Sequence, residues 1–318
     1  YSNNNLDSYN SFGQVGIIQL PSAEVRDEGT VSVTFNRNDI WKIGTLSVSP
    51  FNWLEASYFY YRPSDLKWDG TGKPGDYLDK GFNVKFIYQP KNKYMPNLAI
   101  GLDDFAGTGF FTREYIVSTT NINKSKFTLG LGWGKFVGDD SFKNPFQGLS
   151  ERFKTRPNVS KDLGFGGTPS YNLWFRGDAA IFGGFEYSVP KISNLKFKIE
   201  YDPFNYFDLS ANNRPDASIE LRQKNSDFNY GFSYPINKYM TIDASYIKGN
   251  TFNLNFTIAL TFNDRLSSKP DFRPEIVKKS PVTKNKKIFY EDLLENLNNN
   301  RLFLQTASLT DKKLDIAI

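Results

Sequence analysis

The sequence contains neither cysteine nor histidine among its 318 residues. Without cysteine the chain forms no disulfide and no thiolate metal site. Without histidine it lacks the commonest general base and the commonest metal ligand, so any catalysis would depend on carboxylates or tyrosines. These absences weigh against most hydrolases and metalloenzymes. We therefore expect a non-enzymatic protein with no catalytic residue, no metal site and no cofactor.

Long apolar runs are missing as well. No stretch of 18 or more apolar residues occurs, which excludes a transmembrane helix and leaves a membrane β-barrel open. Aromatic residues nevertheless make up 16% of the chain, while the mean hydropathy is −0.50. A chain that is aromatic-rich but polar on average is typical of a barrel with an apolar outer band and a wet interior. The net charge of +5 is spread along the chain, so we expect no nucleic-acid partner.

The stretch from Thr251 to Phe262 shows the clearest pattern in the chain. Large apolar side chains occupy every second position, and Asn, Thr or Ala fill the positions between them. This period of two predicts a β-strand with one apolar face, since a helix would scatter the same residues around its surface. The length also suits a tilted strand that crosses a bilayer.

The same alternation recurs along residues 31–262 and predicts about twelve strands in up-and-down order. The count becomes fourteen if segment 14–20 or segment 216–224 joins the wall. Short turns alternate with mostly longer loops, which is the asymmetry of outer-membrane barrels whose short turns face the periplasm. We therefore predict an all-β, transmembrane, antiparallel barrel in the outer membrane, with both barrel ends and the C-terminal segment periplasmic.

A soluble β-sandwich or lipocalin-like barrel is the alternative for any one alternating strand. Its apolar face would turn inward, where this many Phe and Tyr side chains would overfill a small interior. A membrane barrel instead places the polar face in a wet lumen, where charges of both signs can pair. The predicted lumen-facing residues are Glu55, Lys85, Asp103, Glu114, Glu186, Lys196, Lys198, Glu200 and Asp243. The same alternation turns Tyr115, Val117 and Trp133 outward.

Composition divides the chain into four segments. Residues 1–28 form a leader and a short strand; residues 1–12 are Asn/Ser-rich and predict a flexible segment, while 16–21 either pairs with the barrel or tucks into its mouth. The barrel spans 29–263, and the Pro- and Lys-rich residues 264–287 form a linker. In 288–318 we expect one helix and two short strands at 302–305 and 314–318, too little for a stable core and so the start of an incomplete periplasmic domain.

Two features look like chemical motifs but have simpler explanations. Gly130-Leu-Gly-Trp-Gly134 lacks the spacing of a nucleotide-binding loop and lies inside a predicted strand, where small lumen-facing residues explain it. Glu186 and Glu200 lie on neighbouring strands and face the same interior, as a glycosidase pair would. Because Lys196 and Lys198 lie beside them, ordinary ion pairing in the lumen is the favoured explanation.

The long loop at 137–177 is a candidate gate. It could fold inward over a lumen that Gly130, Gly132, Gly134 and Gly184 leave uncluttered. Most aromatic residues of the strands point outward by periodicity, which indicates lipid contact. The candidates for glycan contact or gating are therefore Tyr60, Tyr61, Trp68, Phe142, Phe146, Arg152, Tyr171, Trp174 and Arg176.

Several ordered stretches carry a family resemblance. They include Gly16-Ile-Ile-Gln-Leu-Pro-Ser-Ala-Glu24, Pro50-Phe-Asn-Trp-Leu-Glu55, Asp79-Lys-Gly-Phe-Asn-Val-Lys-Phe86, the glycine-rich stretch 99–109, Phe127-Thr-Leu-Gly-Leu-Gly-Trp-Gly134, Phe142-Lys-Asn-Pro-Phe146, Arg152-Phe-Lys-Thr-Arg-Pro157, residues 174–187 and residues 249–254. On these residues the chain resembles the YjbH family, outer-membrane proteins associated with exopolysaccharide and capsule production in Gram-negative bacteria. The resemblance covers about 14–262.

The resemblance implies a role in exopolysaccharide export or assembly, as a conduit or as an accessory protein. The partners it implies are outer-membrane lipid, a polysaccharide and periplasmic export or assembly proteins. Three alternatives stay open beside it: a small-solute porin-like channel, a non-conducting envelope scaffold and a barrel enzyme. Family members are usually longer, with further periplasmic material and a second membrane half.

Overall fold

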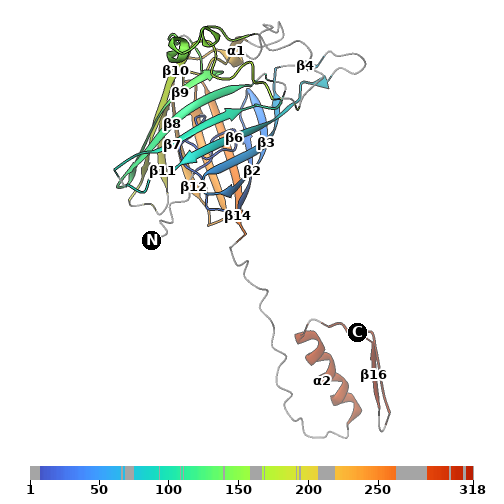
Figure 1. Cartoon of the computed structure of the whole chain (residues 1–318). Coiled ribbons are helices and arrows are strands. Elements are labelled where there is room, and N and C mark those ends of the chain that lie inside the picture. Colours follow the sequence, from blue (N-terminus) through green and yellow to red (C-terminus); the bar gives the residue numbers. More distant parts are fainter. Residues whose placement is uncertain are drawn as a thin grey trace. The chain divides into compact units, whose positions relative to one another are not determined.

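The chain divides into two units in the computed structural model, Tyr1–Arg265 and Leu266–Ile318. The structure describes residues 8–65, 67–68, 75–92, 94–107, 109, 111–138, 140–157, 167, 169–190, 192, 195–206, 219–262, 285–300, 302–310 and 313–317. The first unit is a β-barrel, and the second is a helix followed by a β-hairpin (Figure 1).

Twelve antiparallel strands close the barrel, as the alternation predicted. Each pairs with its neighbours in chain order, and the first pairs with the last. The strands are β1 (Thr30–Arg37), β2 (Trp41–Phe51), β3 (Leu54–Pro63), β6 (Asp79–Tyr88), β7 (Asn97–Asp103), β8 (Arg113–Ile122), β9 (Ser125–Gly134), β10 (Ala180–Ser188), β11 (Lys196–Tyr201), β12 (Phe228–Pro235), β13 (Met240–Ile247) and β14 (Thr251–Thr261). At the closing seam the hydroxyls of Thr34 and Thr257 lie 3.0 Å apart.

The longer connections carry small elements of their own. These are the paired β4 (Lys67–Trp68) and β5 (Gly75–Asp76), the 3-10 turns η1 (Pro145–Gly148) and η2 (Glu151–Phe153), and the short helix α1 (Ile219–Arg222). The fourteen-strand alternative is not found. Residues 14–20 do not join the wall, and the described part of segment 216–224 starts with α1.

Side chains alternate between the two faces of the wall as a period of two requires. On β14, Phe252 is 56% exposed on the outside, while Asn253 and Asn255 are buried inside. The same contrast runs around the ring, with exposed Phe, Tyr, Leu and Ile side chains outside and buried polar or charged side chains inside. An apolar outer face around a polar interior is the arrangement of a barrel in lipid.

Strand β8 departs from the predicted facing. Arg113, Tyr115 and Val117 point inward, and the last two belong to an apolar cluster with residues of the interior. Glu114 therefore lies on the outward face, paired across the strands with Trp133. The prediction that Glu114 faces the lumen is wrong. The prediction assumed that the apolar residues of every strand face outward. On β8, however, Tyr115 and Val117 face inward and pack against apolar residues of the interior.

The two ends of the barrel differ in their connections. One end, the short-turn rim, carries the turns after β2, β6, β8, β10 and β12. The other end, the long-loop rim, carries the connections after β3, β7, β9 and β11. Thr30 pairs with Ser49 and Thr261, so the chain enters and leaves the wall at the short-turn rim.

The second unit contains α2 (Lys286–Asn299), β15 (Thr306–Leu309) and β16 (Leu314–Ala317). The side chain of Asn285 caps the helix by accepting from the N–H of Lys287. The Tyr290 hydroxyl accepts from the Leu309 N–H and so ties the helix to the hairpin. The first strand lies four residues later than the predicted 302–305, because the turn closes through Thr310 and Lys313. Among the helices of the described ranges, none has the length and apolarity to cross a membrane.

Candidate functional site in the barrel lumen

Residues 8–25, called the plug below, lie inside the barrel (Figure 1). All are buried except Phe12, which is half-buried. The plug forms no strand; its only ladder contacts are isolated bridges, Tyr9 with Val15 and Gly16 with Pro21. Residues 8–12, predicted as part of a flexible leader, are therefore enclosed, and segment 16–21 lies in the lumen rather than in the wall.

An irregular backbone inside a barrel must find partners for its N–H and C=O groups. Glu200 on β11 supplies several of them. Its Oε2 accepts from the N–H of Ile18 at 2.9 Å and Leu20 at 3.3 Å, and its Oε1 accepts from the N–H of Gln19 at 2.8 Å. The Asn229 side chain donates to Oε1 at 2.9 Å. This carboxylate thus takes the place of a neighbouring strand.

A second anchor binds the middle of the plug from the opposite wall. Both carboxylate oxygens of Glu55 accept from the Val15 N–H, at 3.2 and 3.3 Å. Lys85 donates to the Val15 carbonyl at 3.0 Å and pairs with Glu55 at 3.1 Å. One ion pair of the wall therefore satisfies both backbone groups of one plug residue.

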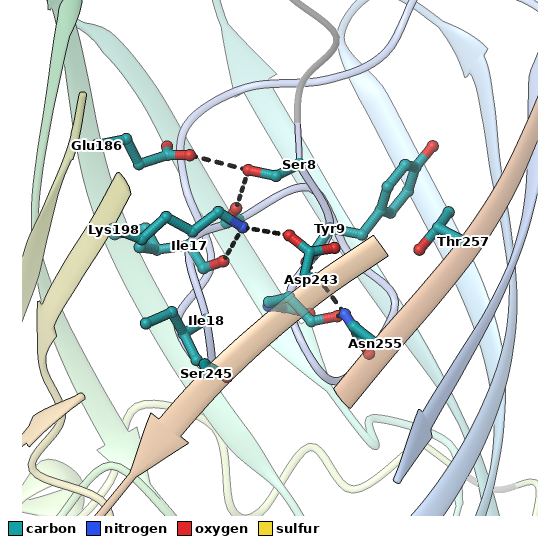
Figure 2. Close-up of polar contacts among 12 residues, drawn as sticks. Ser8, Tyr9, Ile17, Ile18, Glu186, Lys198, Asp243, Ser245, Asn255 and Thr257 are labelled. Atoms are coloured by element: carbon teal, nitrogen blue, oxygen red, sulfur yellow. Dashed lines mark hydrogen bonds and ion pairs between the residues drawn. The ribbon is translucent and has the colours of Figure 1, made fainter. Parts of the chain in front are cut away.

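The third anchor is drawn in Figure 2. Lys198 lies between Ile17 and Asp243, donating to the carbonyl of the first at 2.8 Å and to the carboxylate of the second at 2.7 Å. The Ser8 hydroxyl donates to Glu186 at 2.8 Å. Asn255 donates to the carbonyl of Tyr9 at 3.2 Å (Figure 2).

The fourth anchor lies closest to the long-loop rim. The Gln14 side chain donates to Asp103 at 2.6 Å, and Arg113 pairs with the same carboxylate at 2.5 Å. Arg113 also donates to the Gln19 carbonyl at 3.4 Å. At the short-turn rim, Lys126 pairs with Glu24 of the plug. The plug is therefore held along its whole length by wall charges.

The structure places most of the predicted lumen residues against the plug and not along open water. Eight of the nine face inward and are buried: Glu55, Lys85, Asp103, Glu186, Lys196, Lys198, Glu200 and Asp243. Seven of them have the plug contacts or ion pairs given above. These side chains bind the plug and so hold it inside the barrel.

The lumen is filled rather than uncluttered, which corrects the expectation for the small residues. A Cβ on Gly184 would lie 2.6 Å from Ile17 of the plug. The rings of Phe182 and Phe136 occupy the space beside Gly130 and Gly132. Gly134 does not border the plug, because its neighbour is Arg156 of the outer loop. Two cavities between the plug and the wall, among the described residues, measure about 20 and 10 Å³, which is about the size of one water each.

The described parts of the 137–177 loop pack against the outward positions of β8 and β9. Arg156 donates two hydrogen bonds to Glu114, at 2.6 and 2.8 Å, and the Phe175 N–H donates a third at 3.1 Å. Phe146 stacks on Trp133 with ring centroids 5.3 Å apart. The predicted inward gate is therefore not formed by residues 140–157 and 169–177; residues 139, 158–166 and 168 lie outside the described part.

The glycan or gate candidates are scattered. Tyr60 is 44% exposed on the outward face of β3, whereas Tyr61 is buried inside. The side chain of Trp68 lies outside the described part. In the outer loop Phe142 bridges to Ala179, Arg152 donates to the Tyr171 carbonyl, Tyr171 contacts Trp174, and Arg176 donates to the carbonyls of Thr155 and Asn172.

An aromatic cluster lies inside the long-loop rim, and of its members only Tyr61 was among the candidates predicted from the sequence. Trp41 stacks on Tyr206 at 5.7 Å, and Tyr61 lies 4.1 Å from Phe111. Phe12 of the plug packs against the same cluster. These rings come from four separate connections or strand ends, so no local pattern brings them together in the sequence.

Tyr206 of this cluster and Asp104 beside it have raised pKa values. Burial, and then the negative charge of Asp79, raise the pKa of Asp104 well above its usual range. Burial, and then Asp202, raise the pKa of Tyr206. Asp104 also adopts a positive φ of 51° and accepts from the Phe111 N–H at 3.0 Å. Both groups stay protonated more readily than in water.

Comparison with known proteins gives one family match and several likenesses of fold. The family model described as "Exopolysaccharide biosynthesis protein YbjH" matches residues 8–318. A protein of Escherichia coli (strain K12) described as "Uncharacterized lipoprotein YjbH" is 33% identical over 276 residues, covering 84% of this chain and 38% of that protein. The chain thus spans less than half the length of this curated relative.

Solved structures resemble the barrel at low sequence identity. The KdgM porin is 11% identical with a TM-score of 0.36, covering 73% of this chain and 99% of that one. The NanC porin is 11% identical with a TM-score of 0.33, covering 73% of this chain and 98% of that one. Nothing about transport follows from likenesses of this degree.

Proposed function

Because the chain belongs to the YjbH family of exopolysaccharide biosynthesis proteins, we propose that it is an outer-membrane barrel that serves exopolysaccharide or capsule export or assembly as a closed, non-catalytic envelope component. The observation that carries this proposal is the plug. Residues 8–25 fill the lumen and are bonded to the wall at four levels. A lumen in this state passes neither a glycan nor a stream of ions.

The outer face supports the membrane location. Exposed Phe, Tyr, Leu and Ile side chains cover the strands on the outside, and most of the charged residues near the middle of the strands are turned inward. A soluble barrel would leave this apolar surface in water, at a cost of about 25 cal/mol per Å². Lipid is therefore the first partner of the barrel. The short-turn rim, from which both ends of the wall emerge, is the periplasmic side in this proposal.

The two carboxylates that could have served a glycosidase support a non-catalytic role. Glu200 is occupied by backbone N–H groups of the plug, and Glu186 by Ser8 and Lys126. Neither carboxylate lines either of the two cavities given above for the described residues. In the described part of the chain, no three Asp or Glu side chains come together as a metal site either.

A second candidate function is a conduit that opens when the plug leaves. Both ends of the plug face the short-turn rim: Ser8 bonds to Glu186 near the end of β10, and Glu24 bonds to Lys126 near the start of β9. The plug can therefore be withdrawn through the short-turn rim without either of its ends being pulled through the length of the barrel. The wall would keep its own ion pairs, Lys85 with Glu55 and Lys198 with Asp243, in the hydrated lumen.

Planar-bilayer conductance separates the two candidates and tests the first. The full chain should be electrically silent, and it should stay silent when neutral or acidic oligosaccharides are added to either side. A chain lacking residues 8–25 should conduct. If that deletion does not fold, Glu200→Gln, which weakens the plug without removing it, should give brief openings, while Glu151→Gln in the outer loop should not. A steady open pore in the unmodified chain would refute the closed-lumen proposal.

Accessibility of the plug gives an independent measurement. Since the chain has no cysteine, Ser11→Cys introduces a single thiol at a buried plug position. This thiol should resist a bulky maleimide in the folded barrel, whereas a thiol at the exposed Lys91 or Lys143 should react at once. Labelling of position 11 that begins only when a polysaccharide is added would favour the conduit.

A further inference from the structure

The ring of Phe12 contacts both a cation and an aromatic side chain of the barrel wall. Its face is 4.2 Å from the guanidinium carbon of Arg113, and its centroid is 5.9 Å from the indole of Trp41. It is the only plug residue that is not fully buried. The plug thus places one flat six-membered ring between a cation and an aromatic face, close to the long-loop rim.

A cavity of about 20 Å³ adjoins this ring. Its walls include Phe12, Phe59, Phe111 and Phe204, together with the polar side chains Arg113 and Asp104. Mostly aromatic walls with a few convergent polar groups are typical of small-molecule sites. The present volume holds about one water, and removal of the Phe12 ring would add the space that the ring now fills.

Two of the polar atoms beside this cavity have no partner. Arg113 Nη2 and Asp104 Oδ1 are buried, and neither has a hydrogen-bond partner among the described residues. A buried polar atom left in this state costs about 1–3 kcal/mol. A guanidinium donor and a carboxyl oxygen that accepts when ionised and donates when protonated, next to aromatic faces, match the hydroxyl groups and the apolar C–H face of a pyranose.

The charges around the cavity favour an uncharged ligand. The positive charge of Arg113 is already matched by Asp103, its partner at 2.5 Å. Asp79 adds a further negative charge near Asp104. An acidic sugar would meet like charge here, whereas a neutral one would add no charge to a buried site.

We propose that the space held by the Phe12 ring, between Arg113 and Trp41 and beside Asp104, is a binding subsite for one uncharged sugar ring. The inference rests on the proposed function in one respect, which is that a saccharide is present at this membrane. Arg113 Nη2 donates to a hydroxyl, Asp104 bonds a second, and Trp41 covers the apolar face. Because the sugar and Phe12 occupy the same space, binding of the sugar and seating of the plug compete.

Sugar binding to the full chain in detergent tests the subsite. The probes are a neutral glucose oligomer and an oligogalacturonate of the same length, titrated by calorimetry. Phe12→Ala should bind the neutral oligomer at least tenfold more tightly than the unmodified chain, since no ring has to leave. Tyr9→Ala is the matched control: it removes a ring from the same plug, beside the other lumen cavity, and should bind no better than the unmodified chain.

Further variants keep the outcome decisive. Phe12→Leu removes the flat ring with less loss of packing, and should bind with intermediate affinity if Phe12→Ala does not fold. In the Phe12→Ala background, Arg113→Met should abolish the gain. A folded Phe12 variant that binds no neutral sugar, equal gains with Tyr9→Ala, or a gain for the acidic oligomer alone would each refute the subsite. Bilayer conductance of the unmodified chain tests the proposed function independently of sugar binding. If the barrel is electrically silent but the Phe12 variants bind no sugar, only the subsite is refuted. If the unmodified barrel conducts, the proposed function is refuted.

Discussion

Two buried carboxylates hold irregular segments against the barrel wall, one from the inside and one from the outside. Glu200 faces the lumen and accepts from three backbone N–H groups of the plug. Glu114 faces outward and accepts from Arg156 and from the Phe175 N–H of the outer loop. Each replaces the strand partner that an irregular backbone lacks.

The two sites differ in countercharge. Glu114 is paired with a guanidinium through two parallel hydrogen bonds, a geometry that is strong and specific. Glu200 forms no ion pair among the described residues; its partners are neutral N–H groups and the amide of Asn229. Breaking the outer contact leaves a buried charge alone, whereas the inner one can exchange its donors for water. The comparison indicates that the outer loop is fixed and that the plug is the releasable segment.

The largest expected effect comes from removing the countercharge. Arg156→Ala should destabilise the outer loop by about 3–5 kcal/mol, because Glu114 is then a buried carboxylate without its partner. Trypsin cleavage within 140–177 and thermal unfolding of the barrel in detergent measure this. Adding Glu114→Gln to Arg156→Ala should recover part of the loss, and Lys154→Ala on the exposed side of the same loop should cost little. An unchanged cleavage rate would contradict the comparison.

The inner site should give a smaller effect that is confined to the plug. Glu200→Gln keeps the size of the side chain but turns an N–H₂ group toward plug donors, and should weaken plug attachment by about 1.5–3 kcal/mol, the range for hydrogen bonds to charged groups. Maleimide labelling of Ser11→Cys in this background should be faster, while the midpoint of barrel unfolding stays close to the unmodified value. Equal losses in both readouts would mean that the plug is part of the barrel's core.

Packing against the plug can be tested at Gly184. A methyl group there would lie 2.6 Å from Ile17 and 2.7 Å from the Ile199 carbonyl. Gly184→Ala should therefore cost about 1–3 kcal/mol by overpacking and should also speed the labelling of Ser11→Cys. Gly44→Ala is the control, because a methyl group at Gly44 meets nothing within 4 Å.

Asp104 extends the comparison to a carboxylate near the long-loop rim. Because its folded pKa is raised, the native state binds this proton more tightly, and the stability it contributes at low pH is lost as pH rises from about 3.8 through the folded pKa. Asp104→Asn carries no charge and tolerates the positive φ. It should be more stable than the unmodified chain at pH 8, and the difference should vanish below pH 4. Chemical-denaturation midpoints at several pH values would show a constant difference if burial of Asp104 were unimportant.

The smallest effect is expected at the exposed pair of Glu151 and Lys154. Both side chains are largely solvent-exposed, at 81% and 50%. Glu151→Gln should change stability by less than about 0.5 kcal/mol, as is usual for surface pairs. A larger loss, measured by the same thermal unfolding, would mean that charge alone and not burial explains the strength of the Glu114 contact.

Much of the wall could be predicted from local patterns. Alternation along Thr251–Phe262 and its repeats set the number, order and facing of nearly all strands, since side chains on a strand must alternate between two faces. The resemblance to the YjbH family, carried by ordered motifs, is confirmed. The pattern failed at β8, where Arg113, Tyr115 and Val117 turn inward to meet the plug. The signal was present in the charge of Arg113, which belongs inside a membrane barrel rather than in lipid.

The sequence by itself determined that this chain closes a membrane-type barrel with a charged interior, because a period of two and the burial of charge depend only on neighbouring residues. Only the tertiary structure decided what fills that interior. Val15 to Glu24 has no periodicity, and its polar partners, Glu55, Lys85, Lys198 and Glu200, lie between 40 and 181 residues away in the chain. Whether an irregular segment lies in water or in the lumen depends on those distant partners, since its backbone groups can be satisfied in either place.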